Sequence, residues 1–164
     1  MFLDVLDGVP SEKQTKILCF SSFLLLLVAS TIVIVLLEMS NFAGTLEETQ
    51  LGFDGEYLKN NFSLMGADDM NLFIIANLFD YVFMIAYGSF FFSSSLILSR
   101  KMSETNVWRK MGYVVAIAGV ASACCDAFEN VFLLIMGGFS MFRERHVDHL
   151  LGAVKGLPEE NNVD

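Results

Sequence analysis

The chain has 164 residues, of which 54% are hydrophobic, and it carries a formal net charge of −9. Its mean hydropathy of +0.55 is rare for a soluble domain of this length and typical of a small helical bundle in lipid. The negative charge excludes a nucleic-acid-binding protein, because binding to phosphates requires a basic surface. We therefore predict an all-α integral membrane protein with a single membrane domain covering residues 1–164.

Three apolar runs are long enough to cross the hydrocarbon core of a bilayer as helices, which takes about 20 residues. They cover 17–37, 71–99 and 111–140. The first run is too long for the apolar region of a signal peptide and has no clear cleavage site, so we expect it to be retained. Its polar atoms are mainly Ser and Thr hydroxyls, which can bond back to their own helix. We expect this helix to form a wall or an anchor.

The segments outside these runs predict shorter structures at the membrane surface. Residues 1–16 mix apolar and acidic residues, which favours an interfacial segment, with Ser11 as the N-cap of the first long helix. The loop 38–69 is acidic but has apolar residues at the spacing of a short amphipathic helix, lying on the membrane or capping the bundle. The tail 141–164 predicts an amphipathic juxtamembrane helix that ends before Pro158.

Basic residues gather in the connection 100–110, which is the densest cationic stretch of the chain. The positive-inside rule places this connection and the N-terminus in the cytoplasm, where Lys13 and Lys16 add to the charge. The loop 38–69 and the C-terminus then lie outside, although two arginines follow the third run. A bacterial inner membrane is the expected location.

The third run carries two acids and an amide near its middle, on the same face as a row of small residues. The face has alternating spacings of four and three residues, which lets a neighbouring helix approach closely. It consists of Gly112, Ala116, Gly119, Ala123, Asp126 and Asn130. Glu129 lies one turn from Asp126, at the edge of the face. The second run has a matching stripe, which consists of Asn77, Asp80, Met84, Tyr87, Phe91 and Ser94.

Counting outward from a turn near Ser103 matches the depths of the two stripes. Asn77 then lies level with Asn130, and Asp80 lies level with residue 127. The count predicts one polar cluster of six side chains, namely Asn77, Asp80, Tyr87, Asp126, Glu129 and Asn130. A carboxylate in the middle of a bilayer costs about 2.5–3.5 kcal/mol, so the acids of this cluster need a compensating group.

Three kinds of compensation remain open. The acids can be protonated and hydrogen-bonded to the amides and Tyr87, either as a polar clamp that fixes the helix register or as a proton site. They can bind a divalent cation such as Mg²⁺, Ca²⁺ or Mn²⁺, since these ions prefer oxygen ligands. A partner chain can supply an Arg, a Lys or a peptide amide.

The acids and aromatic residues of the two stripes form a pair of short patterns. These are D-x-x-F-x-x-x-Y at Asp80, Phe83 and Tyr87, and D-x-x-E-N at Asp126, Glu129 and Asn130. The pair resembles motifs of small, uncharacterised multi-spanning bacterial membrane proteins, which often have a fourth helix. The resemblance covers the second and third runs only, and this chain lacks a fourth apolar run. It supports the motif pair and implies no particular chemistry.

Motifs for enzyme chemistry are missing from the sequence. It contains no G-x-S-x-G, no H-E-x-x-H and no phosphate-binding loop. His146 and His149 lie in the tail, and two histidines without a third ligand are weak evidence for a metal or haem site. Cys19, Cys124 and Cys125 fall inside apolar runs, where we expect them to fill the core. An enzyme is therefore the least supported of the candidate functions.

Three membrane spans with a small-residue face and a polar cluster are incomplete as an isolated unit. We therefore expect an accessory or structural subunit of a larger membrane protein complex, with other membrane protein chains and lipids as its partners. The alternative is a homo-oligomer that binds protons or cations at the carboxylate cluster for transport, because intramembrane acids commonly mark ion pathways. Nucleic acid is not an expected partner.

Overall fold

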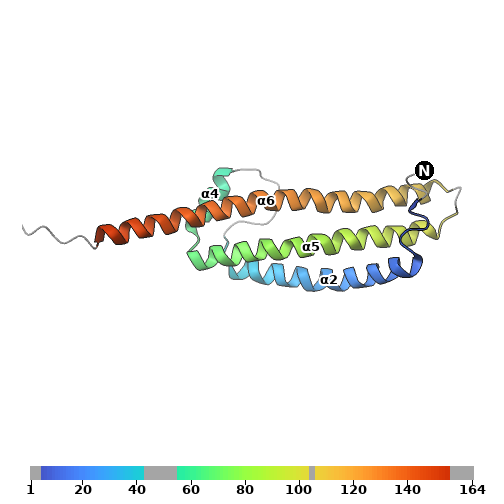
Figure 1. Ribbon diagram of the computed structural model, residues 1–164, viewed down its shortest axis with the longest axis horizontal. Helices are drawn as coiled ribbons and strands as arrows, with labels where there is room; N and C mark the ends of the chain where they lie inside the picture. The colour runs from blue at the N-terminus through green and yellow to red at the C-terminus, as the bar shows by residue number, and fades with distance from the viewer. Residues whose placement is uncertain (1–4, 43–54, 104–105, 156–164) are drawn as a thin grey trace, which may run out of the picture.

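The computed structural model describes residues 5–42, 55–103 and 106–155, with side chains in the last helix described up to Phe139 and at Phe142. These residues form four helices, which are α2 (Glu12–Met39), α4 (Gly55–Leu64), α5 (Ala67–Arg100) and α6 (Val107–Lys155) (Figure 1). No strand occurs within these ranges. The predicted all-α architecture is confirmed.

Three helical segments are long and apolar enough to cross a membrane, namely Glu12–Met39, Ala67–Arg100 and Val107–Phe139. Each one extends the corresponding apolar run at its N-terminal end by several polar or charged residues. Asp68 and Asp69, for example, lie in the first turn of α5, where the helix dipole favours negative charge. Hydrophobicity alone does not reveal such turns, so α5 and α6 begin before their apolar runs, while the start of α2 at Glu12 agrees with the predicted N-cap.

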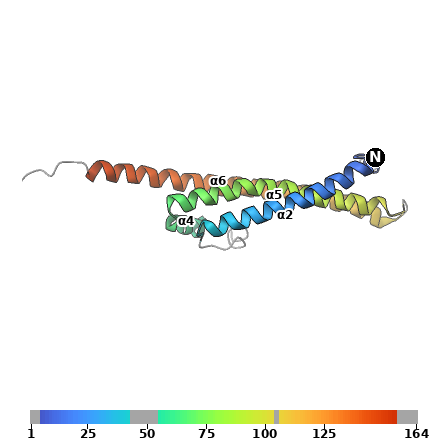
Figure 2. The same cartoon turned by 90° about the horizontal axis from the view of Figure 1, so that it is seen from below.

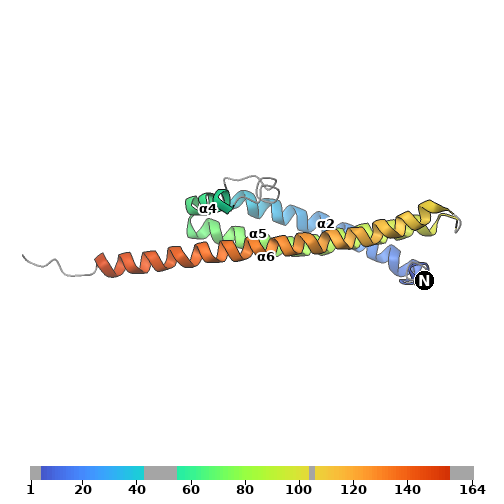
Figure 3. The same cartoon turned by 90° about the horizontal axis from the view of Figure 1, so that it is seen from above.

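The central helix is α5, and α2 and α6 run antiparallel to it on either side (Figure 1). The axis of α2 crosses that of α5 at an angle (Figure 2, Figure 3). Both flanking helices pack along α5 and scarcely touch each other. The three helices therefore form an open bundle, in which grooves remain between α2 and α6 over the surface of α5.

The N-terminal segment folds over the end of the bundle where α5 and α6 are joined (Figure 1). The Arg100 guanidinium donates hydrogen bonds to the Leu6 carbonyl at 3.0 and 2.6 Å and to the Thr15 hydroxyl at 3.0 Å. Ser11 caps α2 as predicted, because its hydroxyl accepts from the Gln14 backbone N–H while the Gln14 side chain accepts from the Ser11 N–H. The segment predicted to be interfacial is thus fixed to the bundle.

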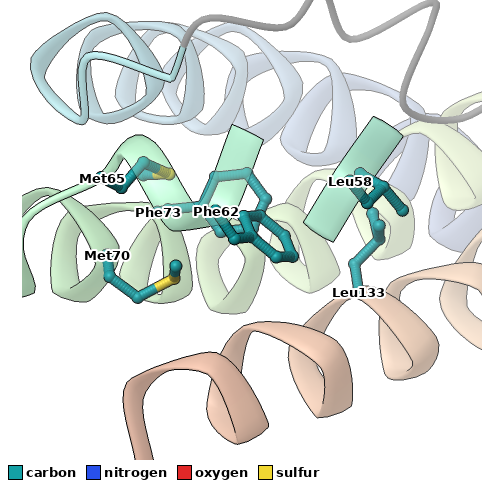
Figure 4. Close-up of a cluster of buried hydrophobic side chains, with 6 residues drawn as sticks. All are labelled: Leu58, Phe62, Met65, Met70, Phe73 and Leu133. Carbon is teal, nitrogen blue, oxygen red and sulfur yellow. The ribbon is translucent and has the colours of Figure 1, made fainter. Parts of the chain in front are cut away.

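The opposite end of the bundle is capped by α4, the short amphipathic helix expected within 38–69. Its apolar face joins α5 and α6 in a buried cluster of six side chains (Figure 4), which are Leu58, Phe62, Met65, Met70, Phe73 and Leu133. The rings of Phe62 and Phe73 meet edge to face with their centroids 5.2 Å apart, an arrangement that aromatic quadrupoles favour. This cluster holds α4 against the ends of α5 and α6.

The last helix covers both the third apolar run and most of the tail. The run was predicted as a membrane span and the tail as a juxtamembrane helix, and α6 joins the two without a break as far as Lys155. Its final turns project beyond the ends of α2 and α5 (Figure 1). Gly137 and Gly138 cost a helix about 1 kcal/mol each relative to alanine, which does not interrupt it, and the first proline after them is Pro158.

Candidate functional site

The contact between α5 and α6 contains a chain of polar side chains at membrane depth. The Tyr87 hydroxyl of α5 donates a hydrogen bond to Oδ2 of Asp126 on α6. The Tyr87 ring lies between Phe83 and Phe91, with centroid distances of 5.5 and 6.3 Å. These aromatic contacts fix the ring, so that the hydroxyl is aimed at the carboxyl group before any ligand or partner arrives.

One turn further along α6, Asn130 bridges the same two helices. Its Nδ2 donates to Oδ2 of Asp80 at 2.8 Å and to the Asn77 carbonyl at 3.3 Å. The Asn77 amide donates in turn to the Phe73 carbonyl within α5 at 2.8 Å. Asn130 is only 1% exposed and Asn77 only 7% exposed. The two amides are therefore interior groups that link α5 and α6, which is how polar side chains commonly hold membrane helices together.

Glu129 stands apart from these hydrogen bonds. It is partly exposed on α6, beside the buried Asn130. It makes no hydrogen bond or ion pair with any other residue in the described ranges. The structure thus joins five of the six predicted cluster residues in two hydrogen-bonded groups and leaves the sixth, a carboxyl group, without a partner inside this part of the chain.

The small residues of α6 lie where α5 approaches most closely. Ala116 is completely buried. A Cβ atom added at Gly119 would lie 2.8 Å from Cβ of Phe91, and one added at Gly112 would lie 1.9 Å from the Ser99 hydroxyl. Ala123 packs on Gly88, where an added Cβ would lie 2.9 Å from the Ala123 methyl group. Gly88 is part of this close contact and was absent from the predicted stripe, because its position falls between the polar residues that define the stripe.

A pocket of about 210 Å³ opens beside Asp80, between α2 and α6. Its walls are mostly apolar, and its lining residues are Ser30, Val33, Ile34, Leu37, Phe73, Ala76, Asn77, Asp80, Phe83 and Leu133. The first helix is thus one wall of the site. Sequence analysis assigned α2 no role in the polar cluster, because the residues that α2 contributes here are apolar apart from one serine.

The basic end of the bundle holds a second polar group, which connects residues far apart in the chain. Oδ1 of Asp7 accepts hydrogen bonds from the Tyr113 hydroxyl and from the Arg109 guanidinium, the latter at 2.5 Å. The pKa of the Asp7 carboxyl is lowered from its ordinary value, first by the hydrogen bond from Tyr113 and then by that from Arg109. Sequence spacing offers no signal for this contact.

The candidate metal ligands do not converge in the described part of the chain, where no three His, Cys, Asp or Glu side chains are placed to hold a metal ion. Cys124 and Cys125 are exposed on α6, so the expectation that they fill the core is wrong. Cys19 is partly buried. The side chains of His146 and His149 lie outside the described residues.

Chemically, this arrangement is a set of hydrogen bonds between two helices, beside the carboxyl group of Glu129 and the pocket at Asp80. It offers no activated nucleophile and no paired acid and base. Comparison with protein families, with curated proteins and with solved structures finds no match to this chain.

Proposed function

We propose that this protein is an accessory subunit of a larger membrane protein complex. One observation carries the proposal, namely that Glu129 is partly exposed on a membrane-crossing helix and has no partner among the described residues. An acid in this position is costly in lipid, and such residues normally pair with another group. A donor or a cation from a second chain would remove this cost.

The depth of Glu129 supports this reading. With a rise of about 1.5 Å per residue, Glu129 lies about 9 Å from the middle of the candidate span Val107–Phe139. The hydrocarbon core extends about 15 Å to either side of its midplane, so Glu129 lies inside it. Long Lys and Arg side chains can reach the headgroups from such a depth, but the glutamate side chain is shorter and its carboxyl group stays in the hydrocarbon core. We infer that the compensating group comes to Glu129 from another chain.

The open arrangement of the helices supports a subunit role as well. The central helix α5 still exposes large apolar side chains, including Ile85 at 65%. In a self-contained bundle the central helix is covered by its neighbours, but here α2 and α6 cover only its two sides. Lipid or another protein chain must cover the rest. The final turns of α6 also extend beyond the ends of α2 and α5 (Figure 1).

The alternative function is proton or cation binding for transport by a homo-oligomer. Glu129 favours it too, because copies arranged around an axis would form a ring of carboxyl groups, as in cation channels. Asp126 already accepts from Tyr87 and Asp80 already accepts from Asn130, each through one oxygen, however, so the cluster offers fewer free oxygens than a hard cation normally binds. We therefore rank the subunit role first.

We further propose that the basic end of the bundle faces the cytoplasm of a bacterium, across its inner membrane. Lys13 and Lys16 begin α2 at the same end as Arg100 and Arg109, while α4 lies at the other end (Figure 1). Under the positive-inside rule, α4 and the C-terminal part of α6 then lie outside.

The substitution Glu129→Gln tests the proposed role. The amide keeps the size of the side chain and removes its charge, so it should weaken a contact to a basic partner group while leaving α6 folded. We expect the variant, affinity-purified from its native membrane in mild detergent, to retain less of its partner chains than the wild type. Glu38→Gln, at the exposed end of α2, is the matched control and should retain them all. Equal retention by all three proteins would contradict the proposal.

A further inference from the structure

The groove between α2 and α6 has the shape and chemistry of a binding site. Its pocket is walled by α2 residues Ser30 to Leu37, by α5 and by Leu133 of α6. Asp80 lies about 5 Å from the middle of α5, so the pocket is deep within the hydrocarbon core. Whatever fills it enters from within the membrane.

One oxygen of Asp80 is free to bind a ligand. Its Oδ2 accepts the hydrogen bond from Asn130 at 2.8 Å, while Oδ1 accepts none from any residue that the structure describes. The neighbouring amide of Asn77 is already used, since it donates to the Phe73 carbonyl. The pocket therefore presents an unused carboxylate oxygen among mostly apolar walls, and it complements a donor or a cation.

The size of the pocket indicates what kind of group enters. Sites for drug-sized ligands usually measure about 300–1,000 Å³, and this pocket measures about 210 Å³. A single long side chain fits that volume. Lys and Arg combine an aliphatic stem with a charged end, and such a stem would lie against Ile34 and Phe83 while its charge reaches Asp80.

Glu129 lies on α6 close to the wall of this pocket. Glu129 lies one turn before Leu133, so both face the same side of the helix. Leu133 lines the pocket and Glu129 does not, so Glu129 lies beside the pocket, one turn along α6. A helix lying along this groove would pass both Asp80 and Glu129.

We infer that this groove receives a membrane-spanning helix of a different chain, whose Lys or Arg enters the pocket and pairs with Asp80. This inference rests on the proposed subunit role and names the chemistry of the partner. The pairing would neutralise the carboxylate in the hydrocarbon core and fix the register of the partner helix, since an ionic contact at this depth is costly to break.

Site-specific photo-crosslinking in the native membrane tests the inference. A photoreactive amino acid replaces Ile34, which is 53% exposed at the pocket, or Ile85, which lies on another face of α5. We expect crosslinks from position 34, but not from position 85, to a peptide of a different chain that spans the membrane and contains Lys or Arg. Asp80→Asn in the same background should reduce the yield by about 30-fold or more, as expected when one partner of a buried charge pair is removed.

Two controls separate the contact from a loss of folding. Asparagine at position 80 can still accept the hydrogen bond from Asn130, so Asp80→Asn should elute as a single species with unchanged thermal stability. Asp126→Asn removes an acid that does not line the pocket and should keep the crosslink. Replacing Asp80 by Lys together with the partner's base by Asp should restore the yield.

The remaining outcomes distinguish this inference from the proposed function. If partner chains co-purify but position 34 crosslinks only to lipid, or if Asp80→Asn leaves the yield unchanged, the inference is wrong and the subunit role stands. If position 34 crosslinks only to a second copy of this chain and no other chain co-purifies, both are wrong and the homo-oligomer is supported.

Discussion

At the scale of single residues, Tyr87 and Asp126 form the most direct link between α5 and α6. The ring contacts of Tyr87 hold its hydroxyl in place, so the bond to Asp126 requires little further ordering. Side-chain hydrogen bonds between membrane helices are worth about 0.6 kcal/mol on average and reach about 1.7 kcal/mol. Because the alternative here leaves a carboxyl group without its donor, we expect a value toward the upper limit.

The substitution Tyr87→Phe should therefore lower the free energy of unfolding in detergent by about 1–2 kcal/mol. The phenyl ring keeps the contacts to Phe83 and Phe91, so the loss reports the hydroxyl alone. Asp126→Asn, which keeps an acceptor oxygen for Tyr87, should cost less. Titration of the folded protein with a denaturing detergent measures both, and a Tyr87→Phe variant as stable as the wild type would contradict the assigned bond.

The glycines of α6 provide a second test with a matched control. Alanine at Gly119 places a methyl group 2.8 Å from Cβ of Phe91, whereas Gly138 has no atom within 4 Å of the added carbon. We expect Gly119→Ala to destabilise the protein by about 1–3 kcal/mol through overpacking. Gly138→Ala should stabilise it by up to about 1 kcal/mol, since alanine favours the helix. The same detergent titration compares them, and equal effects at the two positions would show that α5 does not approach α6 there.

At the scale of helices and segments, sequence reasoning worked where one periodic pattern decides the structure. The three long helices follow from apolar runs, and the α5–α6 pairing follows from two stripes and a count of residues. The hydrogen bond from Asn130 to the Asn77 carbonyl has the register that the count predicts. The capping box at Ser11 was readable because all of its atoms come from four consecutive residues.

Some features of the fold could not be predicted, because they depend on contacts between segments that are far apart in the sequence or uniformly apolar. The angle at which α2 crosses α5, and hence the pocket at Asp80, is set by side-chain packing along a uniformly apolar helix. The contact of Asp7 with Arg109 spans most of the chain and has no local signature. Hydrophobicity drops after the third run, so it does not reveal that the run and the tail form one helix, which no proline interrupts before Lys155.

The N-terminal segment gives a prediction at this scale. The pKa of Asp7 is lowered from its ordinary value of 3.8, so its carboxylate stabilises the docked segment fully above that value. The contribution is lost as the pH falls through the lower pKa of the folded state. We expect the segment to stay docked from neutral pH down to about pH 4 and to open in more acidic solution. Amide hydrogen exchange at Gly8 and Val9 measures the opening.

Asp7→Asn is the control for this titration. Its amide has no charge to lose, so exchange in the segment should be faster than in the wild type at neutral pH and should then vary less with acidification once the intrinsic exchange rate is subtracted. A wild-type segment whose protection does not change below pH 3.8 would show that the Asp7 carboxylate does not hold it.

At the scale of the whole molecule, the hydrophobic composition indicates a membrane environment. The open arrangement of the helices leaves part of the α5 surface uncovered. Three membrane-crossing helices leave α5 covered on two sides only, with Asp80 lining a pocket and Glu129 partly exposed on α6. The buried amides, the small-residue contact and the α4 cap hold this shape without help from outside. A partner is needed only for the carboxyl groups that the chain does not satisfy itself.

The mass of the particle that contains this chain tests the subunit role most directly. The protein is purified in mild detergent from its native membrane at endogenous level, and the mass and composition of the particle are determined together. We predict a particle larger than the chain of 18.3 kDa, with different membrane protein chains in fixed stoichiometry. A particle that contains only copies of this chain would contradict the account.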